Sequence, residues 1–140
     1  ENTRPLVRAC LSSAPQSAGR EAAMSYPWTT VMLRHLPCKV SADQLVQAIA
    51  SLGFRDRYNL VYMPSARQMS NLGYAFVNFN SAEDAILFIQ GFEGFQFNGT
   101  ASVKRGRAEF AVVQGLQSCF ESIMRSARGG SPKGKLLLLL

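Results

Sequence analysis

The strongest structural signal in this 140-residue sequence is the segment Leu72-Gly73-Tyr74-Ala75-Phe76-Val77-Asn78-Phe79. Aromatic and β-branched residues fill this segment, and such a composition favours a β-strand. Successive side chains of a strand point to opposite faces, so every second residue is predicted to enter a hydrophobic core. The inward set is Ala75, Val77 and Phe79, and the outward set is Tyr74, Phe76 and Asn78. The segment therefore predicts a strand that is buried on one face and displays two aromatic rings on the other.

The flanking sequence predicts three more strands and three helices. Apolar residues at helical spacing follow the capping residues Ser41 and Ser81, and a glycine ends each of these two patterns. The predicted elements are a strand at 30–34, a helix at 41–53, a strand at 55–63, a helix at 81–91, a strand within 103–111 and a short helix from 116. The β-α-β-β-α-β order favours a ferredoxin-like α+β fold, in which a four-stranded antiparallel sheet carries two helices on one face.

The chain is predicted to have four parts. Residues 1–27 contain proline and glycine without a sustained period, so we expect a disordered segment. Residues 28–114 form the folded domain, and residues 115–128 form an appended C-terminal helix that packs on it. Residues 129–140 are basic and end in leucines without an alternating pattern, so we expect a flexible tail.

Composition excludes several classes of function. A hydrophobic fraction of 47% is too high for a chain that is disordered throughout. The leucine run 136–140 is far shorter than the ~20 residues that cross a bilayer, so no membrane partner is expected. Three cysteines and one histidine lie too far apart in the sequence for a zinc site, and we expect no metal and no cofactor. Unpaired cysteines favour a reducing compartment, the nucleus or the cytoplasm.

The segment 72–79 also fits a sequence pattern for RNA recognition, Lys/Arg-Gly-Phe/Tyr-Gly/Ala-Phe-Val-x-Phe/Tyr. Six of the seven specified positions match, and only Leu72 departs. The pattern has a physical basis, because outward aromatic rings on an open sheet stack against unpaired bases. Each stacked base contributes roughly 1–3 kcal/mol. We therefore predict that Tyr74 and Phe76 bind single-stranded RNA.

Further RNA contacts are expected on the neighbouring strands. Met32 occupies the outward position of the first strand where a third ring is usual, and its thioether is a weaker stacking group. Arg34 shares that face and can bind phosphate or stack through its guanidinium plane. Basic residues at the fourth strand would border the same face and attract phosphates. The predicted RNA-binding set is Met32, Arg34, Tyr74, Phe76, Asn78, Lys104, Arg105 and Arg107.

Several stretches resemble the C-terminal RNA-recognition motif of the Mei-two-like family. The similar stretches are Thr29–Arg34, Leu36-Pro37, Tyr58, Val61–Pro64, Asn71–Phe79, Ala111 and Gln114-Gly115. The resemblance spans about residues 28–125 and includes Met32 and Leu72, since this family commonly has methionine and an apolar residue at these two positions. The resemblance implies an RNA-recognition fold and RNA binding in post-transcriptional regulation.

Two other functions are compatible with the same fold. An outward aromatic pair can also hold a peptide, so a protein-binding module is the main alternative, and weak salt dependence would distinguish it. A hydrolase of this topology would need an anion cradle after the first strand, but the turn 36–40 lacks glycine and Pro37 removes one amide donor. We therefore expect a monomeric domain without enzymatic activity or catalytic residues.

Overall fold

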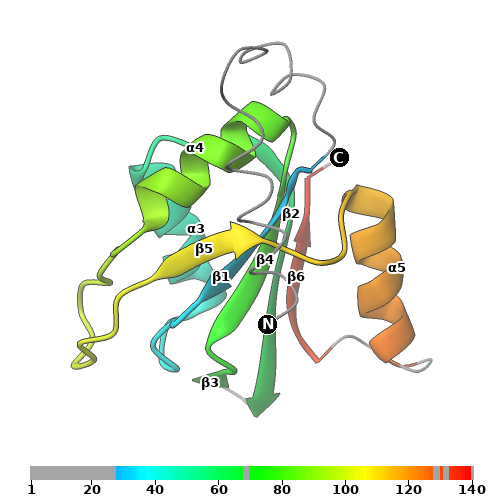
Figure 1. The fold of residues 1–140 in the computed structure, drawn as a ribbon. Helices are drawn as coiled ribbons and strands as arrows, with labels where there is room; N and C mark the ends of the chain where they lie inside the picture. The colour runs from blue at the N-terminus through cyan, green and yellow to red at the C-terminus, as the bar shows by residue number, and fades with distance from the viewer. Residues whose placement is uncertain (1–27, 68–69, 128–129, 131–132, 140) are drawn as a thin grey trace.

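The computed structural model describes residues 28–67, 70–127, 130 and 133–139, so the predicted disordered segment 1–27 lies outside the described residues (Figure 1). The described elements are β1 (Thr30–Arg34), α3 (Ala42–Ser51), β2 (Tyr58–Arg67), β3 (Ser70–Asn71), β4 (Tyr74–Phe79), α4 (Ala82–Phe92), β5 (Arg107–Phe110), α5 (Leu116–Ser126) and β6 (Gly134–Leu138).

The strands form one antiparallel sheet with β4 and β1 in its interior. The strand order is β3-β2-β4-β1-β5, and β6 pairs with β2. Helices α3 and α4 lie together on one side of the sheet (Figure 1). The predicted ferredoxin-like α+β fold is confirmed: the four predicted strands correspond to β1, β2, β4 and β5. The short β3 and the C-terminal β6 enlarge the sheet beyond the predicted four strands.

The main hydrophobic core lies between α3, α4 and the inner face of the sheet. Leu33 and Val77, from the two central strands, are fully buried there. The rings of Phe88 and Phe92 in α4 stack with their centroids 5.3 Å apart. The helical spacing predicted a buried set, and the structure confirms that Leu45, Ile49, Ala85 and Ile89 are buried while Ile86 packs at the edge of the same core.

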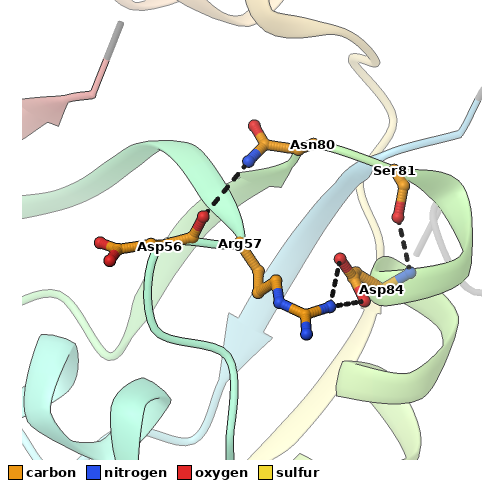
Figure 2. A network of polar contacts seen from close by, with 5 residues as sticks. All are labelled: Asp56, Arg57, Asn80, Ser81 and Asp84. Atoms are coloured by element: carbon orange, nitrogen blue, oxygen red, sulfur yellow. Dashed lines mark hydrogen bonds and ion pairs between the residues drawn. The ribbon is translucent and has the colours of Figure 1, made fainter.

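Polar side chains fix where each of the two core helices begins. Ser41 and Gln44 form the predicted capping box at the start of α3. Ser81 accepts a hydrogen bond from the backbone N–H of Asp84 at the start of α4. Arg57, just before β2, lies 3.2 Å from the Asp84 carboxylate, and Figure 2 shows this contact. The start of β2 is therefore tied to the first turn of α4.

The leucine-rich end of the chain differs most from the prediction. A flexible tail was expected over 129–140, and this is wrong for Gly134–Leu138, which form β6 and pair antiparallel with β2. Leu136 and Leu138 are half-buried and share one face of the strand. Consecutive leucines show no alternation of polar and apolar residues, so the sequence carries no strand period that could have predicted β6.

Gly106 offers a direct test of core packing beside β5. A Cβ added to Gly106 would lie 2.5 Å from the ring of Phe92, which is fully buried and stacked on two neighbouring rings. We expect Gly106→Ala to lower the free energy of unfolding by about 1–3 kcal/mol, measured by urea denaturation. Gly91→Ala, in the open space on α4, is the matched control and should raise stability by roughly 0.5–1 kcal/mol. Unchanged stability in Gly106→Ala would mean that the Phe92 ring moves aside at little cost.

Candidate nucleic-acid interface

The face of the sheet opposite α3 and α4 carries two adjacent cross-strand rows of side chains. Residues that are partners across antiparallel strands lie on the same face, so the register defines each row. The first row is Tyr62, Phe76, Met32 and Glu109, on β2, β4, β1 and β5. The second row is Tyr74, Arg34 and Arg107, on β4, β1 and β5. The structure therefore brings five of the eight predicted residues together in these rows.

Helix α5 packs on this outer face over its β2–β6 side. Its apolar stripe and the outer face form a second hydrophobic cluster, which we call the outer cluster. The buried members are Leu60, Tyr62, Cys119 and Ile123, with Phe76, Leu116, Phe120, Leu136 and Leu138 packed against them. Phe76 is therefore half-buried and supports α5, so it is not a freely exposed ring as the strand parity alone predicted.

A groove of about 330 Å³ lies between α5 and the uncovered part of the sheet. Its floor consists of sheet residues, and its wall consists of residues from α5 and from the preceding connection. The floor is Met32, Tyr62, Pro64, Tyr74 and Phe76, and the wall is Val112, Val113, Cys119, Ser122, Ile123 and Ser126. The groove thus combines apolar surface with two serine residues, a lining typical of sites that hold a small organic group.

The two predicted stacking rings meet edge to face. The centroids of Tyr74 and Phe76 are 5.7 Å apart and their planes make an angle of 82°. Two rings at this angle cannot both lie flat on the sheet, so one presents its face and the other its edge. This arrangement differs from the continuous flat platform expected from the sequence, and it favours stacking at one ring at a time.

Asn78 lies on the predicted face but is only 3% exposed. Its side-chain oxygen accepts hydrogen bonds from the hydroxyls of Thr29 and Thr30, and its amide donates to the side chain of Asn59 at 2.9 Å. The backbone at Gly115, next to α5, donates to the Thr30 hydroxyl at 2.9 Å and closes this region. Asn78 therefore serves the internal structure and exposes little surface to RNA, contrary to the open position expected from strand parity.

The basic residues differ in how far a neighbouring acid neutralises their positive charge. The guanidinium of Arg34 lies 2.9 Å from the carboxylate of Glu109, whose side chain is only 9% exposed. Arg107 and Glu93 are 3.9 Å apart, and both side chains are more than half exposed, so this pair is weak. Lys104 and Arg105 lie in the connection ahead of β5 and are exposed. Of the three residues predicted to form the basic border, Arg107 lies on β5, whereas Lys104 and Arg105 lie ahead of it, and Glu109 neutralises the separate charge of Arg34.

Two titratable groups in the groove, Cys119 and Tyr62, have raised pKa values, which favours their neutral forms. Burial raises the pKa of the Cys119 thiol to about 11. Burial, and then the neighbouring Tyr74, raise the pKa of the Tyr62 phenol above its ordinary value. A thiol with so high a pKa is a poor nucleophile, because the reactive species is the thiolate.

Among the described residues, no group of three or more His, Cys, Asp or Glu side chains is placed to hold a metal ion. No helix in this part of the chain is long and apolar enough to span a membrane.

Sequence reasoning missed two side chains of the rows and the entire wall of the groove. Tyr62 alternates with the buried Val61 and Met63, so the period of two could have placed it on the outer face. Glu109 lies two residues after Arg107 in β5 and shares its parity. No sequence signal locates the α5 wall, because the spacing of apolar residues in a helix does not say which surface it covers.

Comparison with known families now gives this geometry a context. Residues 28–124 match the model of the family described as RNA recognition motif 2. The chain belongs to this family. The matched region runs from Trp28 through β5 and most of α5. It includes both cross-strand rows and every residue of the groove except Ser126.

Curated relatives are Mei2-like proteins. Protein MEI2-like 3 of Arabidopsis thaliana is 30% identical over 102 residues, which cover 72% of this chain and 13% of that protein. Protein MEI2-like 4 of Oryza sativa subsp. japonica is 28% identical over 100 residues, which cover 71% of this chain and 10% of that protein. The chain therefore spans only about a tenth of the length of these relatives.

Solved structures support the same fold. The Rna15 RNA-recognition domain with bound RNA (GU) superposes with a TM-score of 0.54 at 17% identity, covering 71% of this chain and 99% of that one. A Sxl-lethal protein/RNA complex superposes with a TM-score of 0.50 at 21% identity, covering 63% of this chain and 49% of that one. At these identities the likeness establishes the architecture alone.

Proposed function

We propose that this chain is a single-stranded RNA-binding domain in which a base enters the groove and stacks on Tyr74. The observation that carries the proposal is the half-exposed aromatic pair on the floor of a groove about 330 Å³ in volume. Unpaired bases stack on such rings in the RNA-recognition fold. Membership of the RNA recognition motif 2 family supports the proposal, as do RNA-bound structures of similar architecture.

The remaining groups of the interface have separate roles in this proposal. Met32 extends the apolar floor toward β5, and Phe76 holds the floor against α5. Arg107, Lys104 and Arg105 attract the phosphate backbone from the exposed edge at β5. The domain acts without enzymatic activity, metal or cofactor and as a monomer, in post-transcriptional regulation in the nucleus or the cytoplasm.

Replacing Tyr74 tests the stacking step directly. We expect Tyr74→Ala to weaken binding of short single-stranded RNA by roughly 1–3 kcal/mol, because one base–ring contact is lost. Fluorescence anisotropy with an RNA pool of random sequence measures this loss. Leu87→Ala is the control, since Leu87 is exposed on α4, away from the groove, and this substitution should leave the RNA affinity unchanged. Equal affinity of Tyr74→Ala and the unaltered chain would remove Tyr74 from the site.

A peptide is the second candidate occupant, and the apolar lining of the groove favours it. An apolar side chain of a partner protein could fill the same space without any phosphate contact. Salt dependence separates the two candidates: RNA binding should weaken steeply between about 50 mM and about 200 mM salt, whereas binding of an uncharged peptide should not.

A further inference from the structure

An ion pair borders the groove on the side opposite α5. Arg34 is the cross-strand neighbour of Tyr74, and Glu109 is the cross-strand neighbour of Met32. Tyr74 and Met32 both belong to the floor of the groove. A base resting on this floor therefore has α5 along one edge and the Arg34–Glu109 pair along the opposite edge.

The pair is unequally exposed, and this inequality determines what Arg34 can do. The side chain of Arg34 is 29% exposed and that of Glu109 is 9% exposed, at a distance of 2.9 Å between Nη1 and Oε2. A carboxylate buried to this degree needs partners for its charge, so the ion pair of Glu109 with Arg34 holds the guanidinium at the border of the groove. The acid also cancels the charge of Arg34, which reduces its attraction for phosphate.

A fixed, neutralised arginine is suited to reading a base edge. A guanidinium carries five N–H donors in a planar fork, and the bond to Glu109 uses one of them. On the Hoogsteen edge, which a splayed-out base can present, guanine alone has two adjacent acceptors, O6 and N7, that such a fork can bind with two hydrogen bonds. On that edge adenine places an amino donor beside N7 and the pyrimidines offer no acceptor pair, since the adjacent acceptors of cytosine, N3 and O2, lie on its Watson–Crick edge.

We propose that Arg34, positioned by Glu109, makes the groove selective for guanine. This inference rests on the proposed RNA-binding function and adds the identity of the base. Arg34 contacts the base, and Glu109 is a positioning residue that acts through Arg34. Arg107 provides the contrast within the same row, because its own acidic neighbour is distant and exposed, so its charge remains available to phosphate.

The test uses the complete chain and four oligouridine RNAs that differ at one central position, which is U, A, C or G. Anisotropy titrations at two salt concentrations give both the base preference and the salt slope. We expect the G-containing RNA to bind about 5- to 150-fold more tightly than the other three. Arg34→Lys should abolish this preference, since Lys lacks the planar fork, and Glu109→Gln should reduce it, since a neutral amide holds the guanidinium less firmly than a carboxylate. Thermal unfolding of each variant checks that the domain remains folded.

Arg107→Ala is the matched control. It should weaken the binding of all four RNAs equally and flatten the slope of log affinity against log salt concentration by about 0.7. Arg34→Ala should leave the slope unchanged. Equal affinity of the unaltered chain for the four RNAs would overturn guanine selectivity and leave the proposed function standing. Retained preference in Arg34→Lys, or a slope in Arg34→Ala flattened as in Arg107→Ala, would make Arg34 a phosphate contact and also overturn it. Failure of every RNA to bind would overturn the RNA-binding function itself.

Discussion

Phe76→Ala is expected to lose RNA affinity and folding stability together. The ring forms part of the groove floor, so its removal should weaken RNA binding by roughly 1–3 kcal/mol. The same ring packs against the outer cluster beneath α5. Truncating a half-buried aromatic ring there should also lower the free energy of unfolding by about 1–3 kcal/mol. The double effect follows from the position of α5, since an open sheet would leave the stability nearly unchanged.

Cys119 can report whether α5 packs less tightly in Phe76→Ala. Its thiol is buried on the underside of α5, and its pKa is raised to about 11, so a thiol reagent should react with it slowly. In a background with Cys10→Ser and Cys38→Ser, Phe76→Ala should accelerate this labelling several-fold. Tyr74→Ala is the control that should lose affinity without faster labelling, because Tyr74 is not part of the outer cluster. Slow labelling in Phe76→Ala would show that α5 does not depend on this ring.

Asn78→Ala is expected to have the largest effect on stability among the polar substitutions. Its side chain bonds Thr29, Thr30 and Asn59 in a region where Asn78 itself is 3% exposed. Alanine would leave these partners unsatisfied in a poorly solvated site, at a cost of about 2–4 kcal/mol. Thermal unfolding followed by circular dichroism should show a Tm lower by roughly 10 °C.

Asn80→Ala is the matched control for this substitution. Asn80 is exposed, and its side chain makes one long hydrogen bond, 3.4 Å, to the backbone oxygen of Asp56 (Figure 2). Its removal should change the Tm by no more than about 2 °C. Similar losses in the two variants would mean that the network around Asn78 contributes no more than an ordinary surface contact.

The sequence predicted the inner face of the fold well because burial there leaves a periodic signal. Val31, Leu33, Val77 and Phe79 alternate with outward residues, and all four are buried as expected. The capping residues Ser41 and Ser81 placed the starts of both core helices, since each supplies an oxygen to a backbone N–H that has no partner within the helix. Local geometry determines both features, so a single sequence is enough to find them.

The outer face was less predictable because alternation assigns a residue to a face but does not say what covers that face. Asn78 and Phe76 have the parity of an exposed surface, yet Gly115 bonds Thr30, the partner of Asn78, and α5 packs against Phe76, both from more than 30 residues away in the chain. The Arg34–Glu109 pair likewise joins positions that are 75 residues apart. Contacts between such distant segments depend on how the whole sheet is assembled.

The folded unit extends beyond the family motif, because β6 lies after the end of the motif and still packs with it. The match to the family ends at residue 124, inside α5, whereas Leu136 and Leu138 of β6 complete the outer cluster on which α5 rests. The inherited motif and the segment that follows it therefore share one hydrophobic core. Evolutionary change confined to the downstream segment can tilt α5 and reshape the groove while every residue of the motif remains the same. Comparisons restricted to the motif would overlook such a change in ligand preference.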